Sequence, residues 1–294
     1  MTDFDYSIFK DHLIASFTYL LLATNIVLFW IKRNSTLTLT LLGFATFLGL
    51  CTPRLQIISL PSIVLLGIVS YLSFRSKSKY WARFFKAVLA IIGFLFLFHK
   101  VPGFNNWQIV KEAKISPNSL PFNMYLNFDK PLIGILILVF SPIPLLKSAN
   151  SLFSSLKKML PICLMSIFTI ILLSHYMHYV KLDIKYPALF TIWAINNLLF
   201  TCFTEEVFFR GFIHQYLTQA FKKSSYRDYF ALTLSSLLFG LCHFVNIQYI
   251  VLAMIAGLFY GAIYLKTKSI EASIIAHFLL NIVHFLVFTY PAAA

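Results

Sequence analysis

Polar and ionisable residues interrupt strongly apolar runs at three places in the last third of the chain. The three groups are Glu205, Glu206 and Arg210; then His243; then His277 and Asn281. Ionisable groups inside lipid-embedded helices are costly to insert and are candidates for function by default. The three groups therefore predict a polar site inside an otherwise apolar protein.

The first group predicts an ion pair. Glu206 and Arg210 are four residues apart, a favourable orientation for pairing on one helical face. Glu205 lies about 100° further round the helix and is expected to have no local partner. Alternatively, one pair closes a helix end and the second glutamate lies on the surface, but the apolar flanks 198–203 and 207–209 argue against this.

The histidine groups allow a structural and a functional interpretation. His277 and Asn281 share a helical face, and His284 extends the same stripe. Hydrogen bonds between packed helices would explain the stripe without catalysis. His243, near the end of an apolar segment, could equally be an interfacial residue.

Depth in the bilayer links these residues. Counted along ideal helices from the nearest basic loops, Glu205, His243, His277 and Asn281 lie roughly 14–25 Å from the basic side. The four side chains can therefore meet in one layer. A carboxylate in such a layer can act as general base for water. A neighbouring histidine can hold that water, and a histidine with an asparagine can donate hydrogen bonds to an oxyanion. Proton-coupled transport would also use buried glutamate and histidine, and remains open at this point.

The elements that position these residues are apolar segments long enough to be membrane helices. A spanning helix needs about 20 largely apolar residues. The sequence predicts an all-α, polytopic helical membrane protein with about ten such helices, eight or nine being possible because three segments are short or bounded by proline. The segments are 12–31, 36–52, 55–74, 84–99, 131–146, 160–180, 187–222, 229–245, 247–265 and 270–290.

Composition and charge agree with this class. The 294-residue chain is 59% hydrophobic and 12% charged, whereas soluble domains are nearer a quarter charged. Its net charge of +14 comes from clusters in alternate loops, which excludes nucleic acid as the expected partner and favours a cytoplasmic side for those loops. The clusters begin at Lys32, Arg75, Lys147, Lys222 and Lys266. We expect a multi-pass protein of the cell (inner) membrane with both termini outside.

The long polar stretch 100–130 is expected to be an external loop that divides the chain. Residues 1–130 would form an N-terminal group of transmembrane helices without a recognised motif. Residues 131–294 would form the transmembrane core, with the polar motifs between 190 and 290.

The three motifs together resemble a known family. EEVFFRGF, FGLCH and HFLLN match the patterns EExxxR, FxxxH and HxxxN, in order, of the CPBP family of type II CAAX prenyl endopeptidases and bacteriocin-processing (Abi) proteins. The resemblance covers about residues 190–290 and implies a helical intramembrane endopeptidase acting on a membrane-associated protein or peptide.

The resemblance also implies roles for individual residues. Glu205 resembles the catalytic base and His243 the histidine that helps to activate water. His277 and Asn281 resemble the pair that stabilises the oxyanion, and Glu206 and Arg210 resemble structural partners. We expect no metal and no other cofactor, because a Glu205 free of partners is a better base than an arginine-paired Glu206. Zinc held by one glutamate and two histidines is the alternative.

Two other functions remain as alternatives. One is a non-catalytic membrane scaffold or bacteriocin-immunity protein, although the complete motif set argues against loss of catalysis. The other is a proton-coupled transporter, although transporters commonly carry repeats in both halves and here the polar groups lie in one half.

Overall fold

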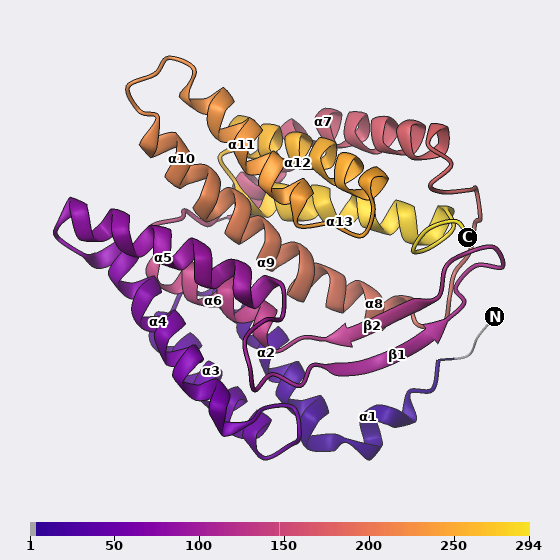
Figure 1. Cartoon of the computed structure of the whole chain (residues 1–294), viewed down its shortest axis with the longest axis horizontal. Helices are drawn as coiled ribbons and strands as arrows, with labels where there is room; N and C mark the ends of the chain where they lie inside the picture. Colours follow the sequence, from indigo (N-terminus) through magenta and orange to yellow (C-terminus); the bar gives the residue numbers. More distant parts are fainter. Residues whose placement is uncertain (1–3, 147) are drawn as a thin grey trace.

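The fold is a bundle of membrane helices with a small β-hairpin at one end (Figure 1). This computed structural model describes residues 4–146 and 148–294, so Lys147 of the third basic cluster lies outside them. The turns α4–α5 and α10–α11 lie at the left of Figure 1, whereas the hairpin and both labelled chain ends lie at the right. This arrangement agrees with the predicted all-α membrane class.

The N-terminal helices form one layer of the bundle. Asn34 and Ser78 begin two of these helices by accepting hydrogen bonds from main-chain amides three residues ahead, as N-cap residues do. The elements are α1 (Ser7–Asp11), α2 (Leu13–Ile31), α3 (Ser35–Leu50), a short 3₁₀ turn (Ile57–Ser59), α4 (Leu60–Arg75) and α5 (Lys79–Leu97).

The C-terminal helices form the rest of the bundle. The helix from Phe190 to Ala220 is continuous and contains two π-helical stretches, a local widening that is frequent at functional sites. Its parts are α8 (Phe190–Asn196), a π stretch (Asn197–Cys202), α9 (Phe203–Glu206), a second π stretch (Val207–His214) and α10 (Gln215–Ala220). Against it pack α11 (Arg227–Leu241), α12 (Ile247–Thr267) and α13 (Ile270–Val287), and α7 (Ala149–Tyr176) packs on α12 and α13.

Each of the ten predicted segments is helical over most of its length in the described residues. Six described helices are long and apolar enough to cross a membrane: Leu13–Ile31, Ile57–Arg75, Lys79–Leu97, Ala149–Tyr176, Ile247–Thr267 and Ile270–Val287. The fifth prediction, a span over 131–146, is wrong. Helix α6 (Asp129–Phe140) has 12 residues and is about 18 Å long, too short for a hydrocarbon core of about 30 Å.

Helix α6 is enclosed within the helix bundle and is too short to cross the membrane. Its residues from Pro131 to Val139 are all buried, so the apolar run that predicted a lipid-facing span packs against protein. Arg33 closes its C-terminal end by donating to the carbonyl oxygens of Leu138, Ser141 and Ile143. A cation at unpaired helix carbonyls is electrostatically favourable.

The segment predicted as a polar external loop contains a two-stranded antiparallel hairpin. Strand β1 (Trp107–Ala113) pairs with β2 (Phe122–Leu126), with Trp107 opposite Leu126 and Ala113 opposite Phe122. Alternate β2 residues are buried and exposed, which is the expected pattern of a half-buried strand. This alternation was present in the sequence, and the polar residues around it concealed it.

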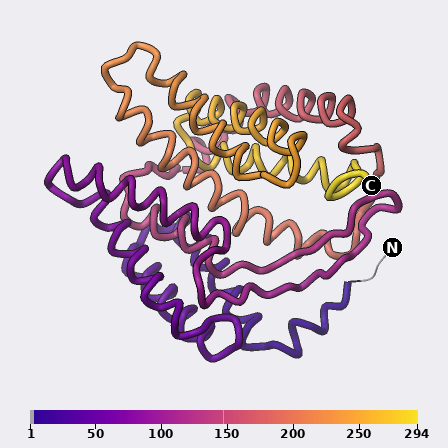
Figure 2. Tube along the Cα trace, viewed as in Figure 1, coloured from indigo at the N-terminus to yellow at the C-terminus, as the bar shows by residue number. Residues whose placement is uncertain are grey.

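The last residues of the chain cross the same end of the bundle as the hairpin. Leu182 pairs with Phe288, and Ser119 pairs with Ala293, in isolated antiparallel bridges. The Leu120 amide also donates to the Ala292 carbonyl. Figure 2 shows these three distant parts of the trace converging near the labelled C-terminus.

Close packing of α6 against α9 gives a test of this arrangement. A Cβ atom added at Gly134 would lie 2.6 Å from the ring of Phe203, which is itself buried beside the polar motif. We expect Gly134→Ala to lower the stability by about 1–3 kcal/mol through overpacking. The measurement is thermal unfolding of purified protein in detergent.

Gly43 is the matched control, because a Cβ atom there meets nothing within 4 Å. We expect Gly43→Ala to leave stability unchanged or to raise it by up to about 1 kcal/mol through helix propensity. Equal effects at the two glycines would contradict the packing of α6 against α9.

Candidate active site

A fully buried ion pair lies at the centre of the site. The Arg210 Nη1 atom donates to Glu206 Oε1 at 2.9 Å, and neither side chain is exposed. Arg210 also donates through Nη2 to the Gly257 carbonyl at 2.9 Å, and its guanidinium lies 4.5 Å from the Phe239 ring centre. The predicted i,i+4 pair is therefore present, and two further helices hold its arginine.

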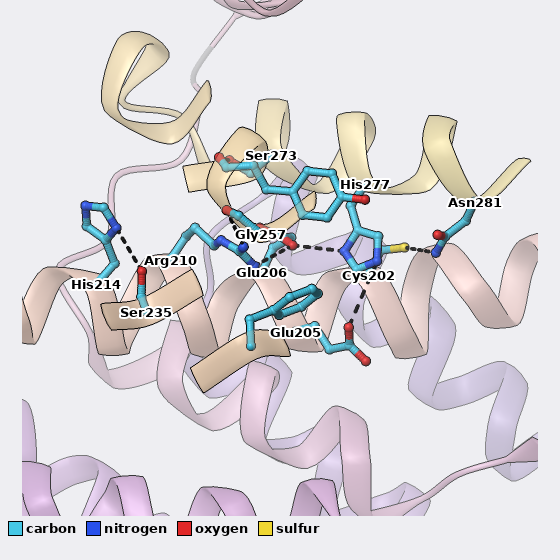
Figure 3. A network of polar contacts seen from close by, with 12 residues as sticks. Cys202, Glu205, Glu206, Arg210, His214, Ser235, Gly257, Ser273, His277 and Asn281 are labelled. Carbon is cyan, nitrogen blue, oxygen red and sulfur yellow. Dashed lines mark hydrogen bonds and ion pairs between the residues drawn. The ribbon is translucent and has the colours of Figure 1, made fainter. Parts of the chain in front are cut away.

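His277 joins this pair from α13. Its Nδ1 atom lies 2.9 Å from Glu206 Oε1, the oxygen that Arg210 also contacts (Figure 3). Its ring stacks on Tyr260 at 4.6 Å between centroids. The other ring nitrogen, Nε2, lies 4.0 Å from Glu205 Oε2. Glu206 thus fixes the ring, and the free edge of the ring faces Glu205.

Asn281 lies one helical turn beyond His277. Its amide nitrogen donates to Asn197 Oδ1 at 3.1 Å and approaches Cys202 Sγ at 3.6 Å. Asn197 and Cys202 belong to the first π stretch of the continuous helix. Neither residue was predicted, because both lie in an apolar run and neither belongs to a motif.

His243 approaches from the end of α11. Its Nδ1 atom lies 2.8 Å from the Phe239 carbonyl oxygen, which as an acceptor requires a proton on Nδ1. In the neutral ring Nε2 then carries a lone pair. The ring nitrogens of His243 lie more than 4.0 Å from the Glu205 carboxylate oxygens, whereas His277 Nε2 lies 4.0 Å from Glu205 Oε2.

Glu205 has a partner that the sequence analysis did not foresee. Lys130 Nζ, from the first turn of α6, donates to Glu205 Oε1 at 2.7 Å. The expectation that Glu205 has no partner is therefore wrong, and so is the reason that it supplied for expecting no metal, because both glutamates have a cationic partner. Motif spacing reveals only partners on the same helix, and Lys130 is 75 residues away in the chain. The only signal in the sequence was a lysine at the start of an apolar run.

A cavity of about 970 Å³ joins the catalytic candidates. Its wall includes Glu205, His243, His277, Asn281 and Lys130. Glu206 and Arg210 do not belong to this wall, although they contact residues that do. The structure therefore places all six predicted residues together and separates them into four on the cavity and two behind it.

Among the residues that the structure describes, no group of three His, Cys, Asp or Glu side chains is placed to hold a metal ion. The Lys130 ammonium occupies Glu205 Oε1, and a second cation at that carboxylate would be repelled. His277 Nδ1 is committed to Glu206.

The Glu206–Arg210 contact gives a prediction about stability. Removing one partner of a buried ion pair leaves a charge unpaired and typically costs about 3–5 kcal/mol. Glu206→Ala should cost more than Arg210→Ala, because Glu206 bonds both Arg210 and His277. In a double-mutant cycle, the double variant should lose less than the sum of the single losses.

Thermal unfolding in detergent measures this cycle, and Arg227→Ala is the control. Arg227 forms a half-exposed pair with Asp228 at 3.7 Å, so its loss should change stability by less than about 0.5 kcal/mol. Additive effects of Glu206→Ala and Arg210→Ala would show that the central pair contributes no coupling.

Comparison with known proteins assigns this region. Residues 187–283 match the family described as type II CAAX prenyl endopeptidase, Rce1-like. The match covers a third of the chain and contains all three motifs. No curated protein and no solved structure matches the chain. The matched family implies endopeptidase activity towards membrane-associated substrates. Residues 187–283 are therefore an Rce1-like domain, in agreement with the CPBP family that the three motifs resemble.

Proposed function

We propose that this protein hydrolyses a peptide bond of a membrane-associated protein or peptide inside its cavity, with Glu205 as general base. One observation carries the proposal: Glu205, His243, His277 and Asn281 line the same cavity within a bundle of membrane helices. A carboxylate, two imidazoles and an amide supply the groups that water-dependent cleavage of an amide requires.

Access selects Glu205 over Glu206 as the base. Glu206 has no exposed surface and shares Oε1 between Arg210 and His277. Glu205 lies on the cavity wall with 10% of its side chain exposed. Its Oε2 atom is buried and, unlike Oε1, has no hydrogen-bond partner among the described residues. A base must reach the proton that it removes, and of the two glutamates only Glu205 borders the cavity.

The first step is attack of water on the scissile carbonyl. Glu205 Oε2 takes one proton from the water while the oxygen bonds to the carbonyl carbon. In its Nδ1–H form, His243 offers the Nε2 lone pair as a second acceptor for that water. Two acceptors fix the orientation of the water, so that a lone pair of its oxygen points towards the substrate, which lowers the entropic cost of attack.

The negative oxygen formed in this step needs donors. His277 donates its Nδ1 proton to Glu206, so it can donate from Nε2 only as an imidazolium, a form that suits a position between two carboxylates. Asn281 can give up its 3.6 Å contact with Cys202 and turn that N–H towards the oxyanion. Each such donor is typically worth about 2.7–4 kcal/mol in the transition state.

The second step breaks the carbon–nitrogen bond. The protonated Glu205 returns its proton to the leaving nitrogen, the oxyanion reforms a carbonyl, and the products are a carboxylic acid and an amine. Glu205 is then ionised again. In this scheme Glu206 and Arg210 do not react but hold His277 and the Glu205 helix in place.

Replacing the base tests the proposal directly. Glu205→Gln keeps an oxygen that can accept from Lys130 but cannot take a proton from water, so we expect cleavage to fall by about 10²–10⁴-fold. Terminal-peptide proteomics of membranes from cells with wild-type protein or Glu205→Gln would reveal the substrate as a protein cleaved only by the wild type.

Glu112→Gln is the matched control, because Glu112 lies exposed on the hairpin. It should give the wild-type set of cleaved termini. If Glu205→Gln also gives the wild-type set, the protein is not a protease that uses this base, and the scaffold or immunity alternative gains support.

Metal removal gives an independent prediction. Because the scheme assigns no step to a metal, purified protein should keep its activity after extensive treatment with EDTA and 1,10-phenanthroline. Elemental analysis should find well under one zinc per chain. Activity lost on chelation and restored by Zn²⁺, with stoichiometric zinc bound, would replace Glu205 as base by a metal site.

A further inference from the structure

Lys130 is a part-buried cation in contact with the proposed base. Its side chain is 14% exposed and that of Glu205 is 10% exposed, and 2.7 Å separates Nζ from Oε1. Lys130 lies outside residues 187–283, so the family match does not include it. Lysine is rarely buried in proteins unless it is paired, so the low exposure of Lys130 depends on its contact with Glu205. The question is what this contact does for Glu205.

A separate polar network fixes the main chain at Lys130. The buried Asp129 carboxylate accepts from the Lys130 amide at 2.9 Å and from the Asn106 side chain at 3.0 Å. His99 Nδ1 lies 2.7 Å from the other Asp129 oxygen, and Asn106 also accepts from the Phe128 amide. The segment between α5 and β1 thereby anchors the first turn of α6, from which Lys130 extends.

The contact makes the two oxygens of Glu205 different. Oε1 accepts from Lys130, whereas Oε2 has no hydrogen-bond partner among the described residues and lies 4.0 Å from His277 Nε2. A carboxylate held by one oxygen cannot exchange its two oxygens by rotation without breaking that bond. The oxygen that has no hydrogen-bond partner is therefore fixed.

We propose that Lys130 is a positioning residue for catalysis, holding Glu205 Oε1 so that the unpaired Oε2 is the oxygen left to take the proton of the water, and so that the carboxylate stays ionised between turnovers. This inference rests on the proposed function. Lys130 takes no proton in the reaction: Oε2 receives the proton of the water and returns it to the leaving nitrogen. The ammonium acts only through the carboxylate.

A pH profile separates positioning from a merely structural ion pair. A neighbouring cation favours the ionised carboxylate, so its removal lets Glu205 take up a proton at higher pH. In Lys130→Met, the acid limb of kcat/KM should therefore move up by about one pH unit or more. We also expect kcat at neutral pH to fall about 10-fold or more, with KM within about twofold, because the base acts in the chemical step.

The assay uses the membrane protein that wild type cleaves and Glu205→Gln does not. Lys130→Arg keeps the charge, so its acid limb should stay at the wild-type pH, while its longer planar group displaces Oε1 and lowers kcat. Lys111→Met removes one exposed hairpin lysine and is the charge-matched control, with wild-type values expected throughout.

Unfolding supplies a measurement that needs no substrate. In a double-mutant cycle of Lys130→Met and Glu205→Gln, thermal unfolding in detergent should show coupling between the two positions. If Lys130→Met does not fold, the unshifted acid limb of Lys130→Arg, together with its lowered kcat, still supports the inference.

The outcomes for the two proposals are distinct. A wild-type pH profile and kcat in Lys130→Met, with Glu205→Gln inactive, would overturn the role of Lys130 and leave Glu205 as base. A shifted acid limb in Lys130→Arg would also overturn it. Full activity in Glu205→Gln would overturn the proposed function itself.

Discussion

The interaction on which the site depends is the ion pair between Arg210 and Glu206, away from water. In a bilayer no solvent can satisfy a charge, so every buried ion must find its partners within the protein. Arg210 meets this requirement with Glu206, the Gly257 carbonyl and the face of Phe239. Glu206 in turn holds His277. One pair thereby fixes α9, α12 and α13 relative to one another, and His277, one of the proposed catalytic residues, is held by it.

The sequence predicted the parts of the structure that depend on local pattern. Apolar length located the helices, and i,i+4 spacing identified the Glu206–Arg210 pair. The span at 131–146 was wrong because composition does not distinguish a helix surrounded by lipid from one surrounded by protein, and α6 is the latter. The hairpin was missed because its five-residue strand carries polar residues on its exposed face. Both errors concern the environment of a segment, which is a property of the whole fold.

Because only local patterns can be recognised in a sequence, only some of the site residues were predicted. Glu205, His243, His277 and Asn281 belong to motifs, and the structure collects them on one cavity. Lys130, Asn197 and Cys202 contact members of that set but carry no pattern in the sequence. Lys130 matters most, because it links the part of the chain without a recognised motif to the proposed base. The sequence division at residue 130 falls inside α6, between Lys130 and the apolar residues that follow it.

The end of the bundle where the cavity wall meets the hairpin is held mainly by main-chain contacts. Leu120 bonds to Ala292, Thr289 bonds to Lys181, and the Asn196 side chain bonds to the Tyr125 carbonyl. Main-chain hydrogen bonds persist when most side chains change, because each residue other than proline carries the same donor and acceptor. Substitutions at this rim can therefore alter the shape and polarity of one end of the cavity while the main chain that carries them keeps its course.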